Sequence, residues 1–164
     1  RMLVFSFSIR AKSCIQYTKD EFVNGLAALG CESLDAVREE IPQMQARLAR
    51  NPQQFREFYE YAYTVSCDEG QKVLGLETAL QLWRLVLGDK FKQIDWWCEF
   101  LETMHRKSIT KDTWCLTLDF ALYVSDDFSN YDSVTSAWPI LLDEFVDWVR
   151  QEKLPQPPAE PCSP

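Results

Sequence analysis

The sequence predicts an all-α protein, a compact bundle of about seven or eight helices. Apolar residues recur at helical spacing along most of the 164 residues, and no alternating pattern is long enough to predict a competing strand. Glycine is rare, with 5 residues. Hydrophobic residues make up 46% of the chain and aromatic residues 13%, which favours a packed core over disorder.

The chain opens with two helical patterns separated by a short loop. Apolar residues predict a first helix over residues 2–10. Thr18 is a good N-cap for a second helix, and Gly30 is a plausible C-cap for it.

This helix-loop-helix resembles an EF-hand with Glu21 at the last position of the loop. Arg10, Lys12 and Cys14 then occupy the positions at which calcium requires oxygen ligands. Ile15 occupies the position that needs glycine. We therefore expect a degenerate EF-hand-like segment without calcium.

The next two helices have clear start signals. Ser33 caps a third helix, within which Pro42 should produce a bend or an interruption. Asn51 and Pro52 open a fourth helix as N-cap and first helical residue. Residues 68–71 form a turn after it.

The second half of the chain predicts four helices. Apolar runs predict helices over residues 76–87 and 94–105. Thr110 caps the next helix, an acidic turn-rich connector follows over residues 126–132, and Pro139 opens the last helix.

The helices indicate one domain over residues 1–151, followed by a proline-rich tail over residues 152–164 that we expect to be disordered. The first residue is Arg1 rather than methionine, so we expect the chain to be a piece of a longer one. No apolar stretch approaches the ~20 residues that a membrane-spanning helix needs.

The formal net charge of -8 disfavours nucleic acid as a partner and suits a basic protein. The six cysteines are scattered without a CxxC pair, which is typical of reduced cysteines in a cytoplasmic or nuclear protein.

The residues offer little that could form an active site. His105 is the only histidine, so neither a structural metal site nor a Cys-His pair is expected, and no glycine-rich phosphate loop is present. We expect no catalytic residues and no cofactor. A small enzyme that uses Cys14 or Cys98 is the competing hypothesis. Asp143 and Asp147 lie four residues apart on one helical face, which fits partner binding and plain solvation equally well.

Four stretches of sequence are the most informative for comparison with known protein families. They are Lys111-Asp112-Thr113-Trp114, Leu118-Asp119-Phe120, residues 127–132 and residues 137–148. These stretches resemble the potentiating-neddylation domain of the defective-in-cullin-neddylation protein 1-like family. The resemblance runs from Arg1 to about Gln151, and family members have a further helix-loop-helix before the point where this chain begins.

The resemblance implies a non-enzymatic scaffold that promotes cullin neddylation. Its partners would be a cullin C-terminal domain, the neddylation conjugating enzyme with its acetylated N-terminal methionine, and a RING ligase subunit within the complex. The family's cullin-facing patch falls on Asp112, Ala137 and Asp143. The alternative is a helical adaptor of EF-hand ancestry that binds no calcium and has another protein partner.

The resemblance also implies an apolar pocket for the acetylated methionine. Its positions fall on Met2, Phe5, Ser6, Cys14, Tyr17, Val65, Leu82 and Leu85. Ser6 and Cys14 depart from the family's pattern. A neutral, acetylated terminus suits an apolar pocket because a buried free ammonium would be costly.

Overall fold

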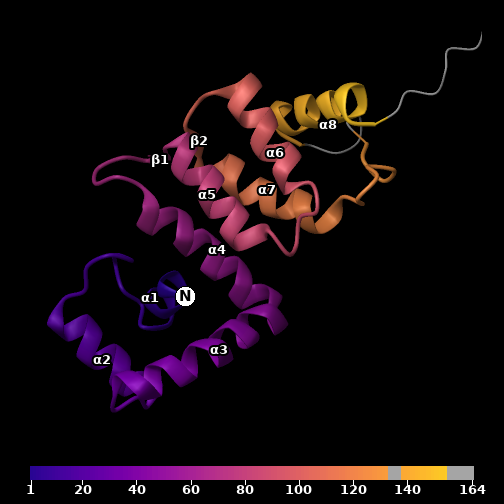
Figure 1. The fold of residues 1–164 in the computed structure, drawn as a ribbon. Coiled ribbons are helices and arrows are strands. Elements are labelled where there is room, and N and C mark those ends of the chain that lie inside the picture. The colour runs from indigo at the N-terminus through magenta and orange to yellow at the C-terminus, as the bar shows by residue number, and fades with distance from the viewer. Residues whose placement is uncertain (133–137, 155–164) are drawn as a thin grey trace, which may run out of the picture. The chain divides into compact units, whose positions relative to one another are not determined.

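The computed structural model describes residues 1–132 and 138–154, which are mostly helical (Figure 1). This confirms the predicted all-α class. Two short strands, β1 (Val73–Leu74) and β2 (Ile109–Thr110), complete the regular structure of the described residues. The chain divides into two compact units, Arg1–Ala79 and Leu80–Pro164, which we call the N-terminal and C-terminal units.

The N-terminal unit is built from four helices and the start of a fifth. They are α1 (Met2–Ser8), α2 (Lys19–Leu29), α3 (Leu34–Arg50), α4 (Pro52–Ser66) and α5 (Leu76–Leu87), which crosses the unit boundary. Helix α1 packs against α3 and α4. One core cluster of this unit contains Phe5, Ile9 and Val37, with Tyr17 and Phe22 packed against it.

Local signals place the ends of these helices as predicted. Thr18 forms a capping box with Glu21, and Gly30 ends α2 with a left-handed φ of 68°. The side chains of Ser33 and Asn51 cap α3 and α4. Helix α1 stops at Ser8, before the predicted end at residue 10.

Two backbone features explain the loop after α1. Arg10 has a φ of 55°, a left-handed conformation that a helix cannot continue through. A Cβ added to Gly25 of α2 would lie 2.4 Å from the Cβ of Ile9. Glycine therefore lets α2 approach the end of α1 closely.

Pro42 lies inside α3, which runs unbroken from Leu34 to Arg50. Of the predicted bend or interruption, the interruption is therefore wrong, and the bend stays a prediction. Pro42 is exposed, while Met44 and Leu48 are buried. Burial of this apolar face compensates for the backbone hydrogen bond that proline cannot donate.

The C-terminal unit contains the rest of α5 and the later helices. They are α6 (Ile94–Phe100), η1 (Leu101–His105), α7 (Lys111–Tyr123) and α8 (Ile140–Glu152). The predicted helix over 94–105 is α-helical only as far as Phe100 and then continues as a π-helical turn. The turn ends at Arg106, which has a φ of 54°.

Aromatic rings fill the core of the C-terminal unit. Trp83 of α5 stacks on Trp114 of α7, with ring centroids 4.9 Å apart. Phe145 of α8 meets Trp97 edge-on at 5.0 Å and Phe120 at 6.0 Å. Helices α5, α6, α7 and α8 are therefore fixed to one another through one set of buried rings.

Within residues 1–132 and 138–154, no helix is long and apolar enough to cross a bilayer. Residues 155–164 of the expected tail, and the connector residues 133–137, lie outside the described residues.

Candidate protein-binding surface

Asp112 lies in the first turn of α7 with its side chain exposed. The Thr110 side chain accepts a hydrogen bond from the Thr113 backbone N–H at 3.2 Å, which caps the helix. Trp114 and Leu118 are buried on the opposite face. A negative charge at this helix end is favourable, and the buried face holds Asp112 at a fixed position on the surface.

Asp143 lies in the first turn of α8 and is half-buried. Its Oδ1 accepts a hydrogen bond from the Tyr131 hydroxyl. Phe145 and Val149 anchor the inner face of α8. The third residue of the predicted cullin-facing patch, Ala137, lies outside the described residues.

Tyr131 is itself held by neighbouring rings. Phe120 meets it edge-on at 5.7 Å and Trp138 stacks on it at 6.5 Å. Burial raises the pKa of the Tyr131 hydroxyl, and the hydrogen bond to the Asp143 carboxylate raises it further. The hydroxyl therefore remains a proton donor at neutral pH.

The acidic connector between α7 and α8 has a fixed conformation over its described part. Asp127 Oδ1 accepts hydrogen bonds from the Ser129 backbone N–H at 3.0 Å and the Ser125 hydroxyl at 2.8 Å. These bonds lower the pKa of Asp127 to about 2. Asn130 Oδ1 accepts from the Ser125 backbone N–H at 2.8 Å, and Phe128 is buried with a φ of 58°.

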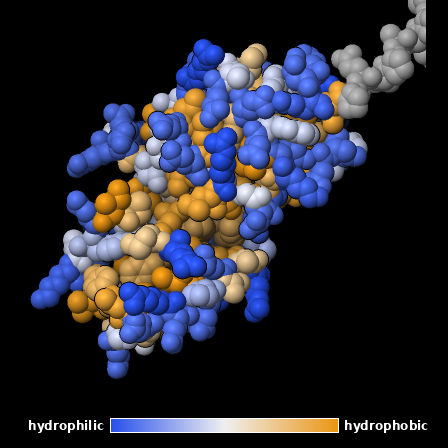
Figure 2. All heavy atoms as spheres, viewed as in Figure 1, coloured by the Kyte–Doolittle hydropathy of each residue, from blue (hydrophilic) through white to orange (hydrophobic). Residues whose placement is uncertain are grey.

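The outer face of α8 adds further negative charge. Glu144 and Asp147 are exposed, and Arg150 lies 4.0 Å from Asp147. Figure 2 shows hydrophilic residues over most of the visible face of the C-terminal unit. The arrangement presents carboxylates on rigid helices, which is suited to binding a basic protein surface.

The residues predicted to line the pocket for the acetylated methionine differ in burial. Phe5 and Ser6 are buried, and Tyr17 is half-buried beside them. The Ser6 hydroxyl donates to the Met2 carbonyl at 2.9 Å and lies 2.7 Å from the Tyr17 hydroxyl. The polar group of Ser6 is therefore satisfied within the fold.

The other predicted pocket residues are more accessible. Met2 and Leu85 are exposed, whereas Cys14, Val65 and Leu82 are half-buried. Tyr17 lines a cavity of about 380 Å³ together with Lys12, Ser13, Gln16, Thr18 and Glu21. That lining contains no other residue of the predicted set, so the eight-residue pocket stays a prediction.

Glu21 closes the loop that resembles an EF-hand. Its Oε1 accepts from the Lys12 backbone N–H at 3.1 Å, and its Oε2 accepts from the Thr18 backbone N–H at 2.9 Å. These bonds hold the pKa of Glu21 below its ordinary value. No group of three or more potential metal ligands occurs among the residues that the structure describes.

The candidate nucleophile Cys98 is poorly suited to catalysis. It is buried, and burial raises the pKa of its thiol to about 11. The thiolate, which is the reactive form, is therefore scarce at neutral pH. Burial and Lys107 lower the pKa of His105, which leaves that ring neutral at pH 7.

The sequence did not predict the hydrogen bond that the Tyr131 hydroxyl donates to Asp143. The sequence marks residues 126–132 as an acidic turn but does not say where the tyrosine hydroxyl points. The sequence places Tyr131 between an aromatic residue, Phe128, and the acids of the last helix. That order is a weak signal for a hydrogen bond to one of these acids.

Helices with acidic first turns, packed on an aromatic core, suit a protein-binding domain. The comparisons identify its family. The family model described as "Cullin binding" matches residues 36–148. The chain therefore belongs to the cullin-binding family.

Three relatives illustrate the similarity. The chain is 34% identical to DCN1-like protein 4 of Drosophila melanogaster over 93% of this chain and 60% of that protein. It is 33% identical to DCN1-like protein 2 of Dictyostelium discoideum, over 93% and 57%. It is 33% identical to human DCN1-like protein 5, over 92% and 63%. The chain thus spans less than two thirds of the length of these relatives.

Proposed function

We propose that this chain is a non-enzymatic scaffold that binds a cullin and promotes its neddylation. The main support is membership of the cullin-binding family together with the two acids, Asp112 and Asp143, on the first turns of α7 and α8. The matched residues 36–148 include both acids.

The proposed cullin site combines charge with a rigid frame. Asp112 is exposed on a capped helix, and Asp143 is half-buried with one oxygen held by Tyr131. Two carboxylates placed on these helices can pair with basic side chains of the cullin C-terminal domain. Ala137 would complete the site because a small side chain allows close approach of the partner backbone.

The second part of the proposal concerns the conjugating enzyme. Its acetylated N-terminal methionine would bind near Tyr17, at those predicted pocket residues that belong to the N-terminal unit: Met2, Phe5, Ser6, Cys14, Tyr17 and Val65. Binding a cullin and a conjugating enzyme together, with a RING ligase subunit in the complex, would raise the effective concentration of the reacting groups and orient them. The chain itself would supply no catalytic group.

A triple variant tests the cullin site. Asp112→Ala, Ala137→Arg and Asp143→Ala together should reduce affinity for a cullin C-terminal domain at least about 100-fold, because two charge-assisted contacts are lost and a bulky cation is added. Isothermal titration calorimetry measures the affinity, and circular dichroism checks that the variant stays helical.

The matched control is Asp20→Ala with Asp35→Ala, which removes two exposed acids from the first turns of α2 and α3. This control should bind the cullin domain as the parent does. Unchanged cullin binding by the helical triple variant would show that the site is assigned to the wrong residues.

A further inference from the structure

Asp143 uses its two carboxylate oxygens differently. Its Oδ1 accepts a hydrogen bond from the Tyr131 hydroxyl, whereas no residue within 1–132 or 138–154 donates to its Oδ2. The side chain is half-buried, so the carboxylate remains accessible to a partner. One oxygen is therefore bonded within the fold, and the other has no donor among the residues that the structure describes.

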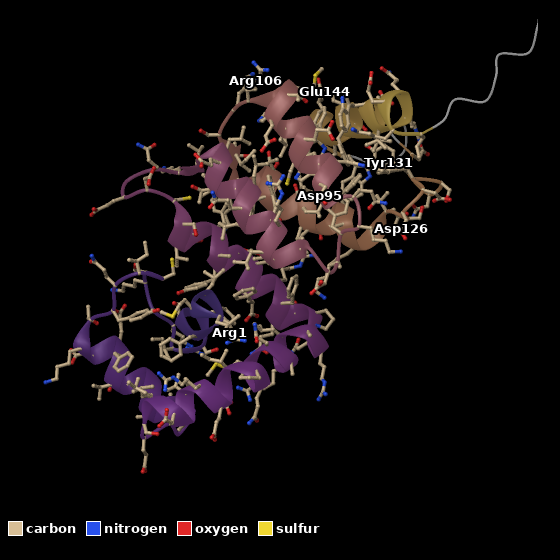
Figure 3. The ribbon with its side chains drawn as sticks, in the orientation of Figure 1. Arg1, Asp95, Arg106, Asp126, Tyr131 and Glu144 are labelled. Atoms are coloured by element: carbon tan, nitrogen blue, oxygen red, sulfur yellow. The ribbon has the colours of Figure 1, made fainter. Side chains whose placement is uncertain are left out.

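The Tyr131 ring cannot easily leave this position. It is 8% exposed, edge-on to Phe120 at 5.7 Å and stacked with Trp138 at 6.5 Å. The Arg150 guanidinium lies 6.0 Å from the ring centroid. Figure 3 shows Tyr131 close to α8. A hydroxyl carried on so constrained a ring is a well-fixed donor.

The connector fixes the backbone on which Tyr131 sits. Phe128 is buried three residues earlier, and the Tyr131 backbone N–H donates to the Phe128 carbonyl at 3.1 Å. Asn130 donates through Nδ2 to the Tyr123 carbonyl at 2.8 Å, which ties the connector to the end of α7. The backbone position of Tyr131 is therefore set by the connector.

We propose that Tyr131 is a positioning residue of the cullin site, which holds the Asp143 carboxylate in its binding orientation before the partner arrives. This inference rests on the proposed function. A free aspartate would lose side-chain freedom on binding, whereas the Tyr131 hydrogen bond restricts it in advance. The phenol is neutral, so it orients the carboxylate without placing a second charge beside it.

The test is a double-mutant cycle on binding to a cullin C-terminal domain by calorimetry. Tyr131→Phe keeps the ring and removes only the hydroxyl, and should weaken binding about threefold to tenfold, the usual range for immobilising one side chain. Tyr123→Phe removes the hydroxyl of an exposed tyrosine of α7 and should leave the affinity unchanged.

The cycle separates positioning from a general effect on the fold. In an Asp143→Ala background, Tyr131→Phe should have no further effect, because the carboxylate and its accepting oxygens are gone. An equal loss in both backgrounds, or no loss in either, would overturn the inference while leaving the proposed function intact. If Asp143→Ala alone bound as tightly as the parent, both the site and this inference would be wrong.

Discussion

At the scale of single residues, Glu21 joins the two ends of the loop that resembles an EF-hand. Its carboxylate accepts hydrogen bonds from the backbone at Lys12 and Thr18, which lie on opposite sides of the loop. A calcium ion links loop segments through carboxylate oxygens. In this chain the Glu21 carboxylate links the two loop segments through its own hydrogen bonds.

The loop closure predicts a pH-dependent contribution to stability. The pKa of Glu21 is lower in the folded chain than its ordinary value of 4.5, so the folded state binds this proton less readily than the unfolded chain. The stabilisation is therefore complete above pH 4.5 and is lost as the pH falls through the folded pKa.

Glu21→Gln replaces one accepting oxygen by an amide nitrogen, which donates and cannot accept. Thermal unfolding should show a lower midpoint for this variant than for the parent at pH 7, and the difference should shrink at pH 3. Glu39→Gln changes an exposed glutamate of α3 and serves as the control. A constant difference at both pH values would mean that the ionised carboxylate does not close the loop.

At the scale of helices, α3 differs most clearly from what its local sequence predicts, because it continues through Pro42. A proline in a helix interior removes a hydrogen bond and crowds the preceding turn, yet α3 continues for eight residues beyond it. The buried Met44 and Leu48 lie in that second half. Packing of the second half therefore keeps the helix intact.

Pro42→Ala should stabilise the protein by about 1–2 kcal/mol, since a gain in helix propensity of up to ~3 kcal/mol is partly offset by greater freedom of the unfolded chain. Urea unfolding at constant m-value measures the change. Gln45→Ala, at another exposed position of the same helix, should change stability by less than about 0.5 kcal/mol. Equal or lower stability of Pro42→Ala would show that the ring itself contributes to packing.

The helix starts could be predicted because each depends on neighbouring residues. Thr18, Ser33, Asn51 and Thr110 cap their helices as expected. The end of α1 and the π-helical turn after Phe100 could not be predicted. Arg106 ends the π-helical turn and Arg10 lies two residues after α1, and both have a positive φ that their residue type does not suggest.

Only part of the candidate site could be predicted from the sequence. Asp112 and Asp143 could be placed on helix first turns by their caps and their apolar periodicity. The bond between Tyr131 and Asp143 joins residues 12 apart across an irregular connector. Its geometry depends on the left-handed Phe128 and on rings from α7, which no local pattern specifies.

At the scale of the whole molecule, the charge balance bears on the kinetics of partner binding. The net charge is -8, and the acidic connector and α8 place several of these charges in the C-terminal unit. Long-range attraction to a basic partner accelerates encounter, and salt screens it.

Raising the salt concentration from 50 to 500 mM should slow association with a cullin C-terminal domain by about tenfold or more and change dissociation much less. Stopped-flow fluorescence of the tryptophans measures both rates. An association rate that does not change with salt would argue against electrostatic steering by this acidic surface.

Calorimetric titration of the intact chain with a cullin C-terminal domain tests the proposed function most directly. The same preparation is first shown to be helical by circular dichroism. We predict saturable binding with one cullin domain per chain. No heat of binding from a folded chain, at protein concentrations of tens of micromolar, would contradict the assignment of this domain as a cullin-binding scaffold.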